Sequence, residues 1–337
     1  MRGAISGFGE VAARAHLPGW RTRENIAIGA IHDPISERRH EAIRLIRNVR
    51  AYDDLELMLD GDAPDFVDVA SPPGMHHEAA RAALRAGAHV LVEKPLALTL
   101  ADFDELAAIA AEKRRVLMCV HNWKYAPAYA AARRAVEAGR LGEICFMSID
   151  RLRTEPAGAG RSGGKWRASA ASGGGILIDH GWHVFYLMCW LLGGESPVSI
   201  SARLESPAGV DVDGVADVRV GFGAGRVARA HLSWRAPVRR TSAVIYGERA
   251  SVEIEGDRVR LTDRSGKAED LSVADIPDDS YHSAWFGGVA EEFERAVTEG
   301  TDSPIARRNL AEARIALALI DAARQSAVNN GIEINIP

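Results

Sequence analysis

The sequence predicts an α/β protein in which a doubly wound parallel sheet is followed by an α+β domain on a large, mostly antiparallel sheet. A glycine-rich turn follows a short apolar strand at the start, and apolar runs then alternate with helical patterns over the first ~120 residues. Between residues 197 and 262, short strands are separated by turns that contain glycine, which is typical of antiparallel sheets. Because 337 residues are many for one domain, we expect two, 1–121 and 122–337.

The glycine turn has the spacing of a dinucleotide-binding motif. Residues 1–6 are predicted to form a strand, which is followed at once by the G-x-G-x-x-A sequence Gly7-Phe8-Gly9-Glu10-Val11-Ala12. Gly7 permits the tight turn, Gly9 lets a pyrophosphate approach the backbone, and Ala12 is small enough for the helix to pack on the sheet. The helix directs its N-terminal N–H groups at the phosphates. Because glycine-rich turns are common, the alternative is an ordinary strand-to-helix turn.

The second predicted strand indicates which dinucleotide is bound. The apolar run 26–31 ends at His32-Asp33, and an acid about 20 residues beyond the glycines accepts hydrogen bonds from the ribose 2′-OH. The same carboxylate repels a 2′-phosphate, so the sequence favours NAD, with NADP as the alternative. Arg38 is expected either to stack on the adenine or to be a solvated helix residue.

The remaining elements of the first domain follow in alternating order. We expect helices at 36–49, at 76–86 and after Thr99, which forms a capping-box-like pair with Asp102, and strands at 65–70, 88–92 and 116–120. Ligands of open parallel sheets bind at the carboxyl ends of the strands. The residues at those ends are Gly7–Gly9, Asp33, Ser71-Pro72-Pro73, Glu93-Lys94 and His121-Asn122.

The second domain begins where this alternation stops. We expect, in order, a helix at 127–138, a strand at 144–153, a glycine-rich loop at 157–164 before Lys165-Trp166-Arg167, and an apolar helix at 176–192. Several short strands follow up to residue 262, and helices return at 284–299 and 307–329.

Three residues have the functional groups that proton transfer requires. Lys94 directly follows a strand end and would project its ammonium into the crevice beside the sheet. Asp179 and His183 are spaced i, i+4 on one helix face, where a carboxylate orients an imidazole and stabilises its protonated form. Each has a structural alternative: a surface lysine, a paired aspartate and a satisfied core histidine. His180 is expected either to line the substrate cavity or to hydrogen-bond a backbone carbonyl.

Composition argues against several other classes of function. The net charge is −5 with both signs mixed along the chain, so there is no basic stripe for nucleic acid. The most apolar run, 176–192, contains charged and imidazole side chains, which argues against a membrane span. The three cysteines are far apart and no histidine motif for zinc is present, so we expect no metal. Since the chain shows no secretory leader, we expect a cytoplasmic protein.

Taken together, these residues resemble the Gfo/Idh/MocA family, named for glucose–fructose oxidoreductase, inositol dehydrogenase and a rhizopine-catabolism protein. The landmarks extend over essentially the whole chain: Gly7-Phe8-Gly9, Ser71-Pro72-Pro73 with His76, Glu93-Lys94-Pro95, Asn122 with Pro127, Trp166-Arg167, and Gly173-Gly174-Gly175 before Asp179 and His183. The resemblance implies a Rossmann domain that binds NAD, and catalytic roles for Lys94, Asp179 and His183. With the motif and the strand ends, it implies cofactor contacts from Gly7, Phe8, Gly9, Glu10, Val11, Asp33, Arg38, Ser71, Pro72, His76, Glu93, Lys94, Asn122, Trp166 and Arg167.

Two positions depart from the family pattern. Lys124 stands where members often carry an arginine, and Tyr186 stands where they often carry an aspartate. These departures concern the substrate rather than the cofactor. Aromatic side chains provide flat apolar faces for sugar rings, and the candidates here are Trp123, Tyr125 and Trp182.

The resemblance implies reversible oxidation of a secondary alcohol on a sugar, sugar nucleotide or cyclitol, with hydride moving between the carbinol carbon and the nicotinamide. The residues expected at the substrate are Lys94, Trp123, Tyr125, Asp179, His180, Trp182 and His183. The alternatives are a redox-neutral, glycoside-cleaving enzyme with tightly bound NAD and a non-catalytic NAD-binding regulator. Because the outer face of the large sheet needs a cover, we expect the chain to form oligomers, and the resemblance implies a homodimer or homotetramer.

Overall fold

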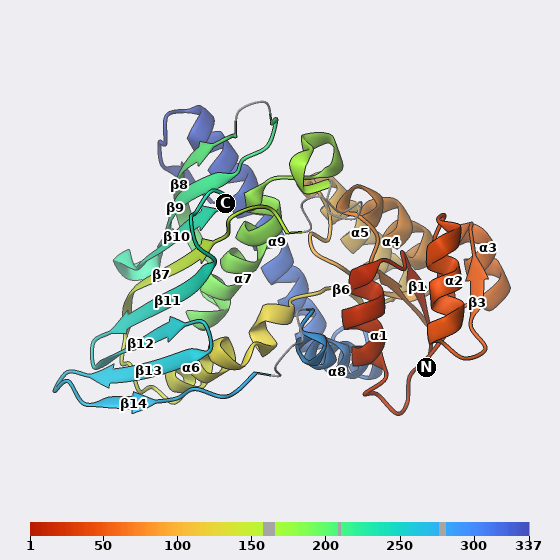
Figure 1. Ribbon diagram of the computed structural model, residues 1–337, viewed down its shortest axis with the longest axis horizontal. Helices are drawn as coiled ribbons and strands as arrows, with labels where there is room; N and C mark the ends of the chain where they lie inside the picture. Colours follow the sequence, from red (N-terminus) through yellow and green to blue (C-terminus); the bar gives the residue numbers. More distant parts are fainter. Residues whose placement is uncertain (158–165, 208–209, 276–280, 337) are drawn as a thin grey trace. The chain divides into compact units, whose positions relative to one another are not determined.

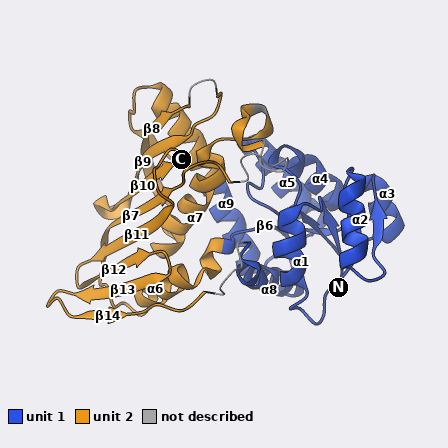
Figure 2. Ribbon diagram, in the orientation of Figure 1, with its two compact units in different colours: residues 1–122, 276–314 blue, residues 123–275, 315–337 orange. Residues whose placement is uncertain are grey.

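A computed structural model describes the chain except for residues 158–165, 208–209, 276–280 and 337 (Figure 1). The chain forms two compact units (Figure 2). Unit 1 contains residues 1–122 and 276–314, and unit 2 contains residues 123–275 and 315–337. Of the residues predicted for the second domain, those from 281 to 314 are therefore part of unit 1. Most of the predicted glycine-rich loop at 157–164 falls outside the described residues.

Unit 1 is built on a six-stranded sheet in the order β3-β2-β1-β4-β5-β6, and every pairing in it is parallel. This order is that of a doubly wound Rossmann sheet and confirms the predicted fold class. The strands are β1 (Arg2–Ser6), β2 (Ala27–His32), β3 (Arg50–Tyr52), β4 (Phe66–Val69), β5 (His89–Val92) and β6 (Leu117–Cys119). Strand β3 was not predicted, because three residues are too few to show an alternating pattern.

The helices of unit 1 connect these strands and add a return from late in the chain. They are α1 (Leu17–Trp20), α2 (Ser36–Leu45), α3 (Leu55–Asp62), α4 (His76–Arg85), α5 (Leu100–Lys113), α8 (Ser283–Glu299) and the start of α9 (Pro304–Val328). The first helical segment contains a π-helical turn, η1 (Ala12–His16). The predicted cap of α5 is confirmed, because the Asp102 N–H donates to Thr99 Oγ1 at 3.1 Å.

The return of α8 and α9 to unit 1 is explained by packing and by one side chain. The Trp20 ring contacts the rings of Phe66, Phe286 and Phe293, with centroids 4.8, 5.5 and 5.9 Å away. Asn309 donates to the carbonyl of Cys119 at 2.9 Å and accepts from its N–H at 2.7 Å. Asn309 thereby pairs the backbone N–H and carbonyl of Cys119 on the outer edge of β6, and these groups would otherwise be buried without partners.

Unit 2 is built on a nine-stranded sheet in the order β14-β13-β12-β11-β7-β10-β9-β8-β15. Only β7 and β10 pair in parallel among the described strands, so the sheet is mixed and mostly antiparallel, as predicted. The strands are β7 (Ile144–Leu152), β8 (Pro197–Glu205), β9 (Val215–Phe222), β10 (Val227–Ser233), β11 (Arg240–Gly247), β12 (Ala250–Glu255), β13 (Arg258–Asp263), β14 (Ala268–Asp270) and β15 (Ile334–Asn335).

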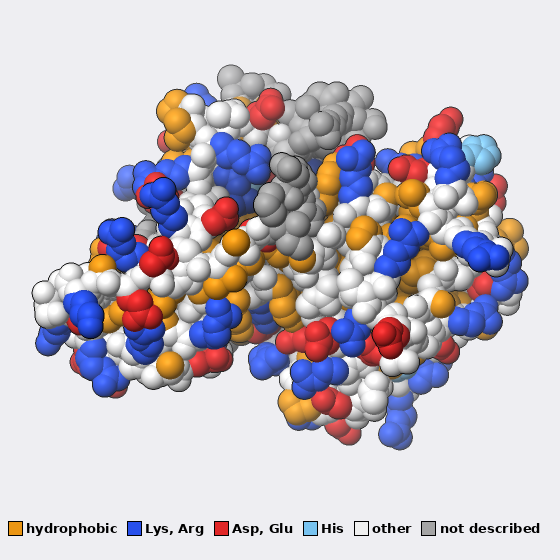
Figure 3. Space-filling model, turned by 60° about the horizontal axis from the view of Figure 1, so that its bottom comes forward, with side chains coloured by type: hydrophobic (Ala, Val, Ile, Leu, Met, Phe, Trp, Pro, Cys, Tyr) orange, Lys and Arg blue, Asp and Glu red, His pale blue; other side chains and the backbone are white. Residues whose placement is uncertain are grey.

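One face of this sheet carries helices. They are α6 (Pro127–Glu137), α7 (Trp182–Leu191) and the C-terminal part of α9. The predicted apolar helix at 176–192 is two elements, a π-helical turn η6 (Leu177–Gly181) that continues into α7. On the side of the molecule that Figure 3 shows, basic and acidic side chains are intermingled. None of the described helices has both the length and the apolar character that crossing a bilayer requires.

Candidate active site

The glycine turn of unit 1 has the geometry that a bound pyrophosphate needs. Gly7 has a φ of +88°, and a Cβ there would lie 2.6 Å from the backbone of Ser71. Only glycine therefore fits this position. At Gly9 a Cβ would meet no atom within 4 Å, so the missing side chain leaves open space above the turn. A dinucleotide phosphate requires this space, and the residues present fit NAD.

Asp33 is fully buried at the end of β2 and holds the glycine turn. Its Oδ2 accepts from the Phe8 N–H at 2.8 Å, and its Oδ1 accepts from the Ile35 N–H at 2.9 Å. Arg38 Nη1 lies 3.4 Å from Asp33 Oδ2. Arg38 is thus an ion-pair partner of the acid, which neither of the two sequence-based alternatives anticipated. The carboxylate shapes the turn in addition to its predicted role at the ribose.

His76 joins two of the predicted strand-end turns. Its Nδ1 lies 2.7 Å from the Pro95 carbonyl oxygen, and its Nε2 lies 2.7 Å from that of Ser71. Burial lowers the pKa of His76. The Lys94–Pro95 peptide bond between these turns is cis. The structure therefore brings the Ser71-Pro72 and Lys94-Pro95 segments together through His76.

Two polar atoms at the strand ends are buried and lack a hydrogen-bond partner within the described part of the chain. They are Ser71 Oγ, after β4, and Asn122 Oδ1, after β6. A buried polar atom without a hydrogen-bond partner lowers the stability of the folded protein. Both residues are predicted cofactor contacts, and a dinucleotide supplies hydroxyl and amide groups that satisfy such atoms.

A buried cluster of His16, Asp68 and Glu93 in unit 1 was not predicted from the sequence. His16 Nδ1 lies 2.9 Å from Asp68 Oδ2, and His16 Nε2 lies 3.2 Å from Glu93 Oε1. Burial opposes the charged imidazole, but the two carboxylates outweigh it and raise the pKa of His16 to about 9. Glu93 Oε2 in turn accepts from the Lys94 N–H at 2.9 Å. The cluster therefore extends from the middle of β4 to the backbone of Lys94.

In unit 2, the predicted acid and base lie at the junction of η6 and α7. Asp179, His180 and His183 are 3%, 6% and 6% exposed. π-Helical turns are rare and occur often at functional sites. Arg167, predicted as a cofactor contact, places its Nε 3.0 Å from Asp179 Oδ2, and His180 Nε2 lies 3.9 Å from the same oxygen. The expected contact between Asp179 and His183 stays a prediction.

His183 is held by a residue that departs from the family pattern. Its Nδ1 lies 3.0 Å from the Tyr186 hydroxyl, which also accepts from the Trp123 N–H at 3.0 Å. The His183 ring stacks on the Trp123 indole, with centroids 4.2 Å apart and an interplanar angle of 1°. Tyr186 therefore occupies a position from which its hydroxyl orients the imidazole of His183.

The candidate sugar-binding aromatics are mostly inside the unit. Trp182 is fully buried and Trp123 is 6% exposed, whereas Tyr125 is partly exposed. Trp123 contacts the ring of His183 and the guanidinium of Arg151. It therefore organises polar groups in this unit, and its contact with a sugar ring stays a prediction.

Arg151 and Arg153 are further polar residues that the sequence analysis did not single out. They share the inward-facing parity of β7 with Ile149, which is buried. Charged residues at positions of a strand where apolar ones are expected are a signal that the sequence does contain. Among the described residues, no group of three or more histidine, cysteine or acidic side chains has a geometry that holds a metal ion.

Comparisons with known proteins also divide the chain into a Rossmann part and a C-terminal part. Residues 1–121 match the NAD-binding Rossmann fold of the Gfo/Idh/MocA oxidoreductase family, and residues 129–253 match a C-terminal domain of the same family. The chain is 32% identical over 204 residues, 60% of its length, to D-glucoside 3-dehydrogenase of Escherichia coli K12 and covers 57% of that protein. It is 37% identical over 143 residues, 42% of its length, to D-apiose dehydrogenase of Paraburkholderia graminis and covers 38% of that protein.

Solved structures show the same fold. Levoglucosan dehydrogenase in complex with NADH has a TM-score of 0.86 at 22% identity, with 100% of this chain and 99% of that one covered. An inositol dehydrogenase homologue from Azotobacter vinelandii, complexed with NAD+, has a TM-score of 0.85 at 21% identity and covers 99% of this chain and 97% of its own. The chain spans about half the length of the curated relatives it matches. Both domain matches and the strand order of unit 1 lead to one conclusion: the chain belongs to the Gfo/Idh/MocA family of oxidoreductases with an NAD-binding Rossmann fold.

Proposed function

We propose that this protein is an NAD-dependent dehydrogenase or reductase that acts on a secondary alcohol or ketone of a sugar, sugar nucleotide or cyclitol. The observation that carries the proposal is His183, a buried imidazole fixed by Tyr186 and Trp123 one helical turn after the buried carboxylate of Asp179. A base in this setting, in a chain with a dinucleotide turn, fits alcohol oxidation. Relatives named D-glucoside 3-dehydrogenase, D-apiose dehydrogenase and 1,5-anhydro-D-fructose reductase support a carbohydrate substrate.

The proposed chemistry divides between the two units. Bound NAD would accept a hydride from the carbinol carbon. His183 removes the hydroxyl proton, and we assign this role to Nε2, because Nδ1 is at the tyrosine hydroxyl. A positioned base of this kind contributes about 10²–10⁴-fold. Asp179 stabilises the imidazolium, and Lys94 stabilises the developing alkoxide through its ammonium.

The test is a panel of sugars, sugar nucleotides and inositols, each incubated with NAD or NADP, in which the nicotinamide absorbance reports the reaction. We expect reduction of NAD by at least one class, and loss of turnover in His183→Ala and Lys94→Ala. The histidine variant should keep its NAD affinity within several-fold, because His183 belongs to unit 2 and the glycine turn belongs to unit 1. Normal turnover in either variant would remove that residue from the mechanism.

The same panel separates the alternatives. Release of a sugar fragment without accumulation of NADH would indicate the redox-neutral, glycoside-cleaving reaction with tightly bound NAD. NAD binding without turnover of any substrate would indicate a regulator.

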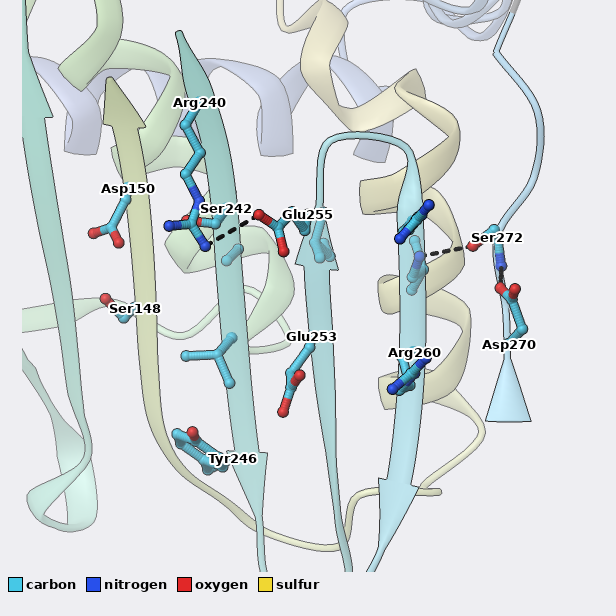
Figure 4. Close-up of a pocket in the computed structure, with 15 residues that line it drawn as sticks. Ser148, Asp150, Arg240, Ser242, Tyr246, Glu253, Glu255, Arg260, Asp270 and Ser272 are labelled. Carbon is cyan, nitrogen blue, oxygen red and sulfur yellow. Dashed lines mark hydrogen bonds and ion pairs between the residues drawn. The ribbon is translucent and has the colours of Figure 1, made fainter. Parts of the chain in front are cut away.

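We further propose that a second copy of the chain covers the outer face of the sheet in unit 2. This face carries a hollow of about 410 Å³ over β7, β11, β12 and β13 (Figure 4). Basic and acidic side chains alternate across it, with Arg240 Nη2 3.1 Å from Glu255 Oε1 and with Tyr246 46% exposed. Both signs of charge and an exposed aromatic side chain favour association with a second copy of the same face, because a two-fold interface pairs each surface with itself.

A further inference from the structure

The helix-facing side of the sheet in unit 2 contains a concentration of guanidinium groups. Arg151 and Arg153 lie on β7 and at its end, and the charge of Arg239, just before β11, acts on both. Arg167 adds a fourth guanidinium next to Asp179. The Asp179 carboxylate acts on Arg151 and Arg153 as well. The guanidinium groups of Arg151, Arg153 and Arg167 thus all interact with one carboxylate, that of Asp179.

Within the described part of the chain, Arg151 and Arg153 donate hydrogen bonds to neutral groups. Arg151 Nη1 donates to Thr241 Oγ1 at 2.5 Å, and its guanidinium lies 4.4 Å from the Trp123 ring centroid. Arg153 Nη1 donates to the Leu152 carbonyl at 2.6 Å and to the Arg240 carbonyl at 3.2 Å. These acceptors are neutral, so they orient the guanidinium groups without cancelling their charge.

Two buried donors at this place have no hydrogen-bond partner among the residues described. They are Arg151 Nε and the hydroxyl of Tyr129. The Tyr129 ring is parallel to that of Trp123, at an angle of 8° and a centroid distance of 6.3 Å. Tyr129 also interacts electrostatically with both Arg151 and Arg153. A ligand with anionic oxygens would satisfy both donors, because such oxygens accept several hydrogen bonds each.

Holding these charges together is costly. Burial lowers the pKa of Arg151 to about 10, helped by the neighbouring Arg239, and lowers the pKa of Arg153 to about 9, helped by Arg151 and Arg239. An anion bound between them would relieve this repulsion.

We propose that the sugar-like substrate carries an anionic group, a carboxylate or a phosphate, that binds to Arg151, Arg153 and Tyr129 while His183 acts on its hydroxyl. Arg151 and His183 both contact the indole of Trp123, so the charged group and the proposed base lie around one side chain. The inference rests on the proposed function and narrows its substrate class to sugar acids or sugar phosphates.

The experiment compares neutral and charged forms of one sugar frame. D-Glucose, D-glucuronate and D-glucose 6-phosphate, and the corresponding galactose series, are tested with NAD. We expect kcat/KM for one charged form to exceed that of its neutral partner by about 30-fold or more. The uronate and phosphate arms distinguish the two anions. Salt should raise KM for the charged substrate more than for the neutral one.

The variants test whether Arg151 reads the charge. Arg151→Gln should lower the charged-to-neutral ratio of kcat/KM by about 30-fold, and Arg151→Lys should restore part of it. The control is Arg134→Gln, an exposed arginine on α6, which should keep the ratio. If Arg151→Gln does not fold, Arg239→Gln is the second test variant. Arg239 is exposed, and its charge acts on Arg151 and Arg153. A structural role for Arg151 would affect neutral and charged sugars equally, and an unchanged ratio overturns the proposal.

A binding measurement separates this proposal from the proposed function. Calorimetry follows D-glucuronate, D-glucose 6-phosphate and inorganic phosphate binding to the full chain in the presence of NAD. If neutral sugars reduce NAD as efficiently as charged ones, the anion proposal fails and the dehydrogenase stands. If no sugar reduces NAD but Arg151→Gln abolishes anion binding, the proposed function fails and the anion site stands. Equal anion binding by wild type and Arg151→Gln overturns the site.

Discussion

In unit 1, His16 Nδ1 lies 2.9 Å from Asp68 Oδ2, and both side chains are buried. The Trp20 indole N–H also donates to Asp68 Oδ2, at 2.7 Å, and the ring of Phe286 stacks on the imidazole with centroids 3.9 Å apart. The charged pair is therefore enclosed by aromatic rings. Through Glu93 it reaches the Lys94 N–H, so the catalytic lysine proposed here starts from a backbone fixed by a buried ion pair.

This pair predicts how stability depends on pH. The pKa of His16 is raised from 6.5 to about 9 in the folded chain. A raised pKa stabilises the fold fully below the unfolded value of 6.5, and the stabilisation is lost as the pH rises through 9. We expect the free energy of unfolding of unit 1 to fall by roughly 3 kcal/mol over this window, as measured by denaturant titration.

The control for the pH dependence is His40→Gln, an exposed residue on α2, which should keep the wild-type profile. His16→Gln should be less stable at pH 6.5 and lose the decline toward pH 9. If that variant does not fold, NMR titration of His16 in the wild type reports the same quantity. An imidazole that titrates near pH 6.5 would contradict the prediction.

The buried carboxylate of Asp33 leads us to predict a preference for NAD over NADP. Asp33→Asn keeps an oxygen that accepts from the Phe8 N–H but removes the charge that repels a 2′-phosphate. It also releases Arg38 from its ion pair, which makes a guanidinium available to the phosphate. We expect the ratio of kcat/KM for NADP over NAD to rise by roughly 10–100-fold, or about 1.4–2.8 kcal/mol. An unchanged ratio, with both cofactors tested at saturating substrate, would show that Asp33 only shapes the turn.

We predict that the hydroxyl of Tyr186 holds the imidazole of His183 in position. Tyr186→Phe removes the hydroxyl at His183 Nδ1 and leaves the Trp123 N–H without this acceptor. Loss of such hydrogen bonds costs about 1–3 kcal/mol, so we expect kcat to fall roughly 5–100-fold and the pH profile of kcat to shift. Tyr246→Phe, which removes a hydroxyl on the opposite face of the sheet, is the matched control. A loss confined to KM would argue against a role in holding the imidazole.

The outer face of the sheet predicts self-association. We expect sedimentation velocity to show a dimer or a larger species at micromolar concentration. Tyr246→Asp, which places an unpaired carboxylate in the proposed interface, should shift the chain toward the monomer. Arg134→Glu, on the helix-covered side of the sheet, should not. A monomeric wild type would exclude this face as a stable interface.

Local patterns in the sequence determined the parts of the protein that depend on a few neighbouring residues. The glycine turn, the cap at Thr99, the strand-end turns and the order of the Rossmann elements are of this kind, because each follows from backbone freedom, capping or periodicity within a short stretch. The apolar helix at 176–192 was predicted, but its π-helical start was not, since that start depends on how the turn packs.

The tertiary structure alone decided what those elements bring together. His16 meets Asp68 and Glu93 across 52 and 77 residues, and Asn309 meets Cys119 across 190. The guanidinium of Arg151 contacts the indole of Trp123, and the ring of His183 stacks on the same indole. These contacts form because β7, α7 and the segment before α6 pack on one another in unit 2. Contacts of this range are fixed by how side chains from distant elements fill one interior, and no local pattern contains that information.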